Sequence, residues 1–212
     1  MSEFYSAEEI QPRYEEIVPV YQKAFAGPPW YEVSMCPDPE QRCTGGLSPI
    51  EVGERCQRCL LRPAETAYPA ERLIARLGNI GKTRETSWYI EENECGLTLA
   101  ALAWLTTARV VAEEKYADVP AMQGWLSDRF GDRPFVWLDE VFANKLNQVS
   151  GNLANFAGMC RGFQDRLGND LPLAYRTITP QMIAAAARDF EVAPLEVPDW
   201  RSFIMIERGS SS

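Results

Sequence analysis

The sequence predicts a single mixed α/β domain, in which helices pack on both faces of one sheet, and three observations carry this prediction. The chain has 212 residues, a length typical of one domain. Its composition, 46 % hydrophobic and 24 % charged, is that of a globular protein. Helical and extended patterns follow one another in the order α-α-β-β-β-α-β-α-β-β, with no internal repeat. We therefore expect a domain over residues 1–208 and a flexible tail over residues 209–212.

The first two helices have clear start signals. Ser6 and Glu9 have the spacing of a capping box, and apolar residues then recur at helical spacing as far as Phe25. A glycine and two prolines follow and should end this helix, and we expect Pro19 to bend it. The second helix should begin at Pro69, since proline suits the first helical turn.

The rest of the chain alternates between apolar-rich strands and helices. The first two strands are separated by turn residues and should form a β-hairpin. The expected strands cover residues 87–91, 97–107, 135–143, 171–178 and 200–206, with a further extended stretch at 192–197. The expected helical segments cover residues 110–116, 122–130, 153–167 and 180–190. Their order predicts one sheet covered by helices.

Composition excludes several classes of function. The chain has no histidine, which excludes Ser-His-Asp hydrolases, Cys-His proteases and HExxH metalloproteases. Acidic residues outnumber basic ones by 30 to 21, and this charge disfavours nucleic acid as a partner. No run of about 18 apolar residues predicts a membrane span, and the start of the chain has no signal-peptide pattern. We therefore expect a cytoplasmic protein with no membrane partner.

Four cysteines fall within residues 34–63, a segment poor in large apolar side chains. They are Cys36, Cys43, Cys56 and Cys59, spaced C-x6-C-x12-C-x2-C. Four thiolates suit a closed tetrahedral zinc site, and metal binding would supply the folding energy that this segment lacks. We therefore predict a small four-cysteine zinc-binding insert with a structural Zn²⁺. Four unrelated reduced thiols and an iron–sulfur cluster are the alternatives.

A strand that ends near Ala143 leads into a helix through a turn that contains Gly151. Such a junction presents unpaired N–H groups at the positive end of the helix dipole. It therefore predicts an anion site, and pyrophosphate fits it.

The order of elements and two phrases resemble the GCN5-related N-acetyltransferase (GNAT) superfamily. Residues 25–32 read FAGPPWYE, which looks like an F-x-G-x-P-W-x-E phrase of a bacterial subset in which a cysteine-bearing insert can follow. Residues 148–153 read QVSGNL, which is similar to the family's acyl-CoA pyrophosphate loop, [RQ]-x-x-G-x-[GA]. Leu153 stands where the family has glycine or alanine. The likeness extends over about residues 8–206.

This resemblance implies an acyl-CoA-dependent N-acetyltransferase that binds acetyl-CoA in an opening between the fourth and fifth strands of the family's sheet. A backbone N–H of the fourth strand would hold the thioester carbonyl, where charge develops. The implied acetyl-CoA residues are Val141, Phe142, Ala143, Gln148, Val149, Ser150, Gly151, Asn152 and Leu153.

The resemblance also calls for a general base and a general acid. Asp139 and Glu140 are neighbours on a strand, so we expect them to point to opposite faces and only one to face the opening. Glu140 is the candidate base, and Asp139, Glu91 or Glu92 could replace it through a water molecule. The family's frequent tyrosine acid falls near Ala185, and Tyr175 is the candidate replacement.

The acceptor should be an amine of a small molecule or a peptide. Clustered carboxylates would make its side of the opening acidic and would favour a cationic amine. These carboxylates are Glu91, Glu92, Glu94, Asp139 and Glu140. A homodimer is left open. Two alternatives remain, a catalytically inactive GNAT-like binding or regulatory module and a zinc-stabilised protein-interaction domain.

Overall fold

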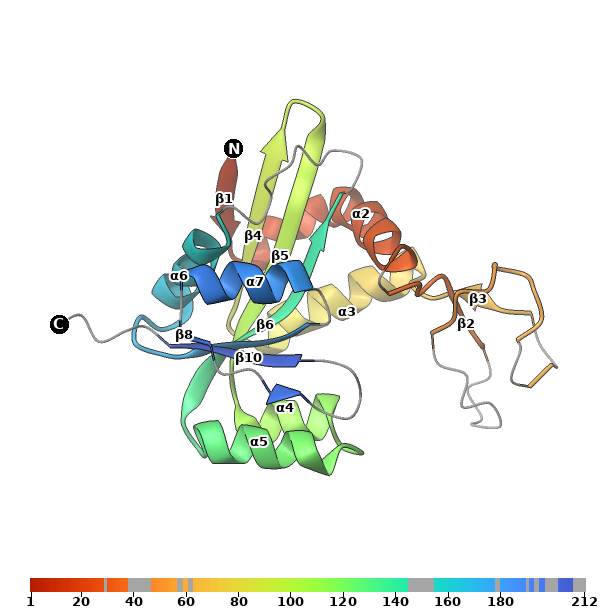
Figure 1. The fold of residues 1–212 in the computed structure, drawn as a ribbon. Coiled ribbons are helices and arrows are strands. Elements are labelled where there is room, and N and C mark those ends of the chain that lie inside the picture. Colours follow the sequence, from red (N-terminus) through yellow and green to blue (C-terminus); the bar gives the residue numbers. More distant parts are fainter. Residues whose placement is uncertain are drawn as a thin grey trace.

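The computed structural model describes residues 1–28, 30–37, 47–56, 59–60, 63–144, 155–177, 180–189, 191–192, 195–196 and 202–207. The strands of its main sheet are β1 (Ser2–Tyr5), β4 (Thr86–Asn93), β5 (Gly96–Thr107), β6 (Pro134–Ala143), β7 (Leu173–Thr177), β8 (Glu191–Val192), β9 (Leu195–Glu196) and β10 (Ser202–Glu207). Their order is β1-β4-β5-β6-β7-β10-β8, with β9 paired to β10 (Figure 1). Among the described pairs, β6 and β7 are parallel and the others antiparallel. The predicted single mixed sheet is therefore confirmed.

Helices cover both faces of this sheet. They are α1 (Ala7–Ile10), the 3-10 helix η1 (Gln11–Arg13), α2 (Tyr14–Ala26), α3 (Ala70–Thr83), α4 (Ala108–Lys115), α5 (Pro120–Phe130), α6 (Phe156–Leu167) and α7 (Pro180–Asp189). Helices α6 and α7 pack on one face, and α1 to α5 pack on the other (Figure 1). None of the helices in the described ranges has the length and apolar character that a bilayer crossing needs.

Each face of the sheet has its own hydrophobic core. The α1–α5 face buries large aromatic side chains, among them Trp88, Trp104 and Phe135. The α6/α7 face buries Phe163 and Leu138 together with Tyr89, Phe156 and Tyr175. Strand β5 contributes to both cores, because its side chains alternate between the faces and nearly all are buried. It is the central strand that joins the two layers.

The start of the chain differs from the sequence prediction in two ways. The Ser6–Glu9 capping box is confirmed, with both reciprocal hydrogen bonds present. The helix does not run on without interruption, however, because η1 separates α1 from α2 at Pro12, which lacks an N–H donor. Pro19 lies within α2, which continues to Ala26. The four residues before the capping box form β1, an edge strand that sequence periodicity did not predict.

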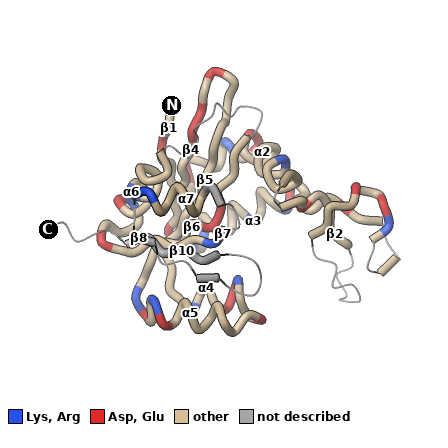
Figure 2. Tube along the Cα trace, in the orientation of Figure 1, with Lys and Arg blue, Asp and Glu red and all other residues tan. Residues whose placement is uncertain are grey.

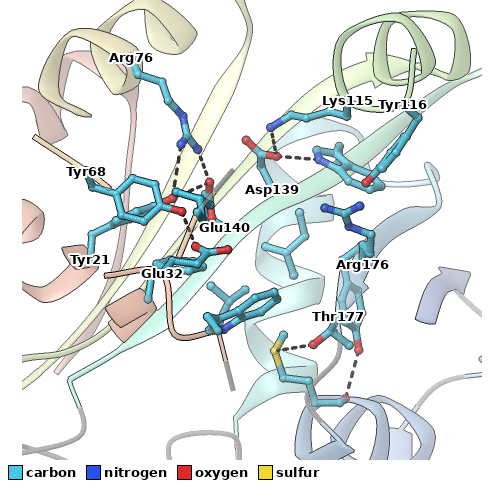
Figure 3. A pocket seen from close by; sticks show the side chains of 18 residues that line it. Tyr21, Glu32, Tyr68, Arg76, Lys115, Tyr116, Asp139, Glu140, Arg176 and Thr177 are labelled. Carbon is cyan, nitrogen blue, oxygen red and sulfur yellow. Dashed lines mark hydrogen bonds and ion pairs between the residues drawn. The ribbon is translucent and has the colours of Figure 1, made fainter. Parts of the chain in front are cut away.

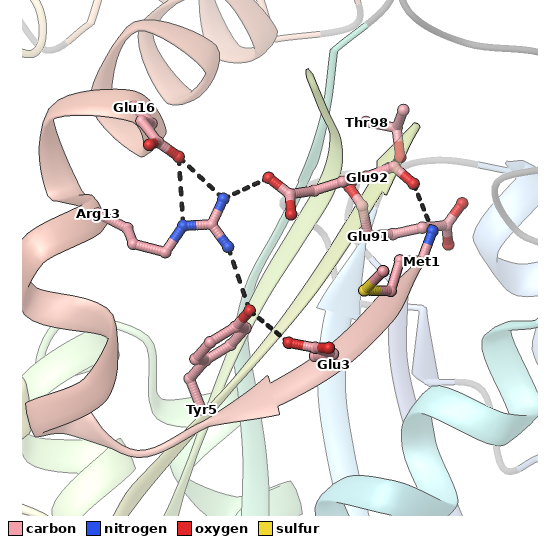
Figure 4. Close-up of polar contacts among 8 residues, drawn as sticks. All are labelled: Met1, Glu3, Tyr5, Arg13, Glu16, Glu91, Glu92 and Thr98. Atoms are coloured by element: carbon pink, nitrogen blue, oxygen red, sulfur yellow. Dashed lines mark hydrogen bonds and ion pairs between the residues drawn. The ribbon is translucent and has the colours of Figure 1, made fainter. Parts of the chain in front are cut away.

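Polar contacts hold this N-terminal segment against β4 (Figure 4). The Arg13 guanidinium forms ion pairs with Glu16 and Glu92 and also donates to the Tyr5 hydroxyl. The terminal ammonium of Met1 donates to the Glu92 carbonyl at 2.6 Å. These contacts join β1 to η1, α2 and β4. They hold the edge strand β1 in place, although its own sequence has too little strand propensity to predict it.

Strand β6 has two irregularities that shape the molecule. Leu138 pairs with Ala103 of β5 and Glu140 pairs with Leu102, so Asp139 is an extra residue in a β-bulge. The parallel pairing of β6 with β7 ends at Leu138, although β6 continues to Ala143 alongside β5. Beyond the bulge, β6 and β7 therefore separate.

The cysteine-bearing segment lies outside the main sheet. Strands β2 (Ser34–Met35) and β3 (Glu65–Thr66) pair antiparallel and join the segment to the body. In Figure 1 this small sheet lies beyond the ends of α2 and α3, away from the main sheet.

Candidate active site

A cavity of about 290 Å³ lies where β6 and β7 separate (Figure 3). Tyr21 of α2 and Arg76 of α3 line it on one face of the sheet, and Met182 of α7 lines it on the other. Because its lining comes from both faces of the sheet, the cavity lies in the gap between β6 and β7. Two molecules could therefore meet there from opposite faces. The resemblance predicted an opening between two neighbouring strands, and the end of the β6–β7 pairing leaves a gap of this kind.

The bulge at Asp139 changes the orientation of the two candidate carboxylates. We expected Asp139 and Glu140 to point to opposite faces, and this expectation is wrong. Glu140 contacts Tyr21 and Arg76, and Asp139 contacts Lys115 of α4, so both lie on the α1–α5 face and line the cavity. An extra residue in a strand breaks the two-residue alternation of side chains, which places neighbours on one face.

Glu140 is held in a buried polar cluster. The Tyr21 hydroxyl donates to Glu140 Oε1 at 3.0 Å, and the Arg76 guanidinium forms an ion pair with the same oxygen. The Glu140 side chain is 12 % exposed. Burial raises the pKa of Glu140, the Asp139 charge adds to this shift, and Arg76 opposes it. Glu140 therefore has the raised proton affinity that suits a general base.

Asp139 keeps its charge in spite of deeper burial, with a side chain only 4 % exposed. Its Oδ1 lies 2.7 Å from Lys115 Nζ and accepts a hydrogen bond of 2.9 Å from the Trp137 indole. Burial acts to raise the pKa of Asp139, but Lys115 and the Trp137 hydrogen bond outweigh it, so the pKa is lowered. Adjacent carboxylates whose pKa values are shifted in opposite directions can divide proton transfer and charge stabilisation between them.

Tyr175, the candidate acid, lines the cavity from β7 and is 1 % exposed. Its hydroxyl donates to the Met182 carbonyl of α7 at 3.1 Å, and its ring packs edge-on against Phe156. Burial raises the pKa of Tyr175, so the hydroxyl keeps its proton. Ala185, which stands near the position of the family's tyrosine, is buried in the core under α7.

The implied acetyl-CoA residues fall into two groups. Val141 lines the cavity, whereas Phe142 packs on the Tyr21 ring at 5.0 Å and Ala143 packs against the α6/α7 core. Among the described strands, none pairs with the β7-facing edge of β6 from Asp139 to Ala143, so this edge can offer backbone donors to a carbonyl oxygen. The other predicted residues, Gln148, Val149, Ser150, Gly151, Asn152 and Leu153, lie outside the described residues.

Polar residues of the cavity that were not predicted as site residues include Glu32, Tyr68, Arg76, Lys115 and Arg176. Glu32 belongs to the FAGPPWYE phrase and accepts a hydrogen bond from Tyr68, so that phrase was a usable signal. The others come from four separate parts of the chain, which no local pattern connects.

The acidic cluster that we expected is only partly at the cavity. Glu91, Glu92 and Glu94 lie at the far end of the β4–β5 hairpin (Figure 2), and none of them lines the cavity. The described lining instead has three acids and three bases. The acids are Glu32, Asp139 and Glu140, and the bases are Arg76, Lys115 and Arg176. Among the described lining residues, positive and negative charges are therefore equal in number, although the chain as a whole is acidic.

Three of the four predicted metal ligands come together. The sulfur atoms of Cys36, Cys56 and Cys59 lie within 4.8 Å of one another, and those of Cys36 and Cys59 are 3.7 Å apart. Tetrahedral bonds of about 2.3 Å to one zinc ion separate two sulfurs by roughly 3.8 Å, so the thiols fit this metal. Cys43 lies outside the described residues.

Comparisons with known proteins identify the fold. No protein-family model and no curated protein sequence matches the chain. Several solved structures match over nearly the whole chain, among them three acetyltransferases with TM-scores above 0.5. One, from Corynebacterium glutamicum, is described as histone acetyltransferase HPA2 and related acetyltransferase. It is 14 % identical, with a TM-score of 0.55, and the match covers 100 % of this chain and 99 % of that one.

The other two structures come from insects. The mosquito arylalkylamine N-acetyltransferase like 5b is 8 % identical, with a TM-score of 0.54 and 98 % coverage of both chains. The Drosophila melanogaster polyamine N-acetyltransferase is 10 % identical, with a TM-score of 0.52, and the match covers 97 % of this chain and 98 % of that one. The chain therefore has the fold of the GCN5-related N-acetyltransferases.

Proposed function

We propose that this protein is an acyl-CoA-dependent N-acetyltransferase that moves an acetyl group from acetyl-CoA to an amine of a small molecule or a peptide. The observation that carries the proposal is the cavity at the separation of β6 and β7, which has a carboxylate pair on one side and an open strand edge on the other. The fold that the chain shares with acetyltransferases supports it.

In the proposed reaction, Glu140 takes a proton from the acceptor ammonium, directly or through water. The free amine then attacks the thioester carbonyl, a C–N bond forms and the C–S bond breaks. A backbone N–H on the open edge of β6, around Val141, stabilises the charge on the carbonyl oxygen. The leaving thiolate takes up a proton, for which Tyr175 is the candidate donor. The amide nitrogen releases its remaining extra proton, and this proton restores the Tyr175 hydroxyl. Asp139, held ionised by Lys115, stabilises positive charge on the amine nitrogen.

Calorimetry with acetyl-CoA tests this proposal. We expect saturable binding that is lost when Gly151 is replaced by leucine, because a side chain there would block the approach of the pyrophosphate to the backbone. Mass spectrometry should then detect acetylated product with a panel of amines. Binding of CoA without any transfer would favour the inactive binding module, and absence of binding would refute the transferase.

The pH dependence of kcat should show which carboxylate is the base. Glu140 must be ionised to accept a proton, and burial raises its pKa, so activity should be lost as the pH falls through a value above the ordinary 4.5. This loss of activity forms the acidic limb of the pH profile. Arg76→Gln should move the acidic limb to higher pH, because the Arg76 charge lowers the pKa of Glu140. An acidic limb that stays in place in the variant would contradict the assignment.

We also propose a structural Zn²⁺ bound by Cys36, Cys56 and Cys59, with Cys43 as the fourth ligand. The sulfur separation supports the site. Zinc would link three parts of a segment that has few large apolar residues, and it would have no part in the chemistry because all four positions are taken. Thiols kept for a metal suit a reducing compartment, which favours the cytoplasm.

Metal analysis of the purified protein should find about one zinc per chain. Cys59→Ser should lower this content severalfold and make the segment sensitive to proteolysis, because one ligand is lost from the closed site. Cys95→Ser is the matched control, since Cys95 is an exposed cysteine in the β4–β5 turn. Iron in place of zinc would favour the cluster, and no metal at all would favour four separate thiols.

A further inference from the structure

Aromatic side chains dominate the walls of the cavity on the α1–α5 face, where we place the acceptor. Four of them form a first aromatic wall, made of Tyr21, Phe25, Trp30 and Tyr68. Its ring centroids are 4.4 Å to 5.9 Å apart, so each ring is supported by another. A second aromatic wall consists of Tyr116 and Trp137, whose rings meet edge-on at 6.5 Å.

The two walls stand on either side of the carboxylate pair. Figure 3 shows Tyr21 and Tyr68 on one side, Tyr116 on the other, and Glu140 between them. The first wall comes from α2 and the loops around residues 30 and 68, whereas the second comes from the end of α4 and from β6. A flat group that enters between the walls would therefore meet ring faces or edges on both sides, with its amine close to Glu140.

Charge at the cavity disfavours a polycation. The carboxylates of Asp139 and Glu140 are already ion-paired with Lys115 and Arg76. A third cation, Arg176, lines the same cavity, and its guanidinium lies over the Tyr116 ring at 4.9 Å. A polyamine or a lysine-rich peptide would bring several positive charges to the cavity. The described lining has no surplus of acidic residues to balance them. A monoamine brings a single ammonium, and Glu140, as the proposed base, would remove that charge by taking its proton.

The size of the cavity also favours a small acceptor. Its volume of about 290 Å³ is at the small end of the range for small-molecule sites, roughly 300–1,000 Å³. A compact amine fits within this volume. Aromatic rings also gain more from ring walls than saturated groups do, because edge-to-face contacts add to the burial of apolar area.

We propose that the acceptor is an arylalkylamine, a compact monoamine whose aromatic ring lies between the two aromatic walls and whose amine reaches Glu140. This inference rests on the proposed acetyltransferase function and names its acceptor class. It distinguishes among the amines that the fold would permit, because structures with this fold include both an arylalkylamine and a polyamine N-acetyltransferase.

The experiment compares three amines with acetyl-CoA as the donor. They are 2-phenylethylamine, 2-cyclohexylethylamine and spermidine. The first two differ only in the aromaticity of the ring, and we expect kcat/KM for 2-phenylethylamine to be higher by about tenfold, as two ring contacts allow. Spermidine should be a poorer substrate by at least about tenfold, because its extra charges find no partner.

Trp30→Leu keeps an apolar side chain but removes a ring from the first aromatic wall. It should abolish the preference for 2-phenylethylamine over 2-cyclohexylethylamine and leave acetyl-CoA binding unchanged. Trp30→Phe keeps an aromatic ring at this position and should keep the preference. This variant controls for a loss of preference that results only from misfolding. Tyr31→Leu is the matched control, because Tyr31 is the next residue, is 52 % exposed and does not line the cavity.

The outcomes separate the acceptor class from the function. If acetyl-CoA binds and spermidine or the cyclohexyl amine is acetylated as well as 2-phenylethylamine, the acceptor class is wrong and the transferase stands. An unchanged preference in Trp30→Leu would also refute the arylalkylamine acceptor. If acetyl-CoA does not bind, the transferase fails, and calorimetry with 2-phenylethylamine alone decides the inference. Saturable binding that Trp30→Leu weakens would then support an aromatic amine site, and no binding would refute it.

Discussion

Replacing Glu140 with glutamine should lower kcat for acetyl transfer by about 10²–10⁴-fold, the usual contribution of a general base. The substitution keeps the shape of the side chain and can still accept the hydrogen bond from Tyr21, but it cannot take a proton. Acetyl-CoA binding should be unchanged, because Glu140 lies on the face of the sheet opposite α6 and α7. Steady-state kinetics measure the loss in kcat, and calorimetry checks that acetyl-CoA binding is unchanged.

Two comparisons make the result specific. Glu113→Gln, an exposed position on α4, should leave kcat unchanged. Asp139→Asn should reduce the rate less and should move the acidic limb of the pH profile to lower pH, since the Asp139 charge helps to raise the pKa of Glu140. If the Glu140 variant lost less than about tenfold in kcat, Glu140 would not be the base and the role would pass to Asp139.

Replacing Phe163 with alanine should lower the free energy of unfolding by about 3–5 kcal/mol, as expected for a buried phenylalanine. Phe163 is fully buried on α6, where it packs against the sheet and meets the Phe4 ring edge-on at 5.3 Å. The loss leaves a cavity between α6 and the sheet that rigid neighbours cannot fill. Urea denaturation should show a lower midpoint with an unchanged slope.

Asp165→Asn is the matched control for this variant, because Asp165 lies on the exposed side of the same helix. Its free energy of unfolding should change by no more than about 0.5 kcal/mol. A loss of under about 1 kcal/mol in Phe163→Ala would mean that the core under α6 can collapse around the smaller side chain.

The sequence predicted best those elements whose signals are local. The capping box at Ser6, the β4–β5 hairpin and strand β6 all depend on residues within a few positions of one another. Strand β1 was missed for the opposite reason. Four residues have too little periodicity to be recognised, and Arg13 and Glu92, which hold β1 in place, are far apart in the chain.

The candidate site shows the same division. Glu140, Asp139 and Val141 could be selected from one strand, and the four cysteines could be selected from their spacing. Their surroundings could not, since Tyr21, Arg76 and Lys115 come from three different helices. The rule that neighbouring strand residues face opposite sides also failed at Asp139. A β-bulge depends on the register with β5, and a single strand's sequence does not record that register.

By itself, the sequence determined the fold class, the absence of histidine chemistry and the positions of a carboxylate pair and a cysteine cluster, because these follow from composition and short spacings. Only the tertiary structure decided that both carboxylates share one cavity, that this cavity is balanced in charge and that aromatic rings line it. Those properties arise where β6 leaves β7, and they depend on side chains from at least four elements that folding alone brings together.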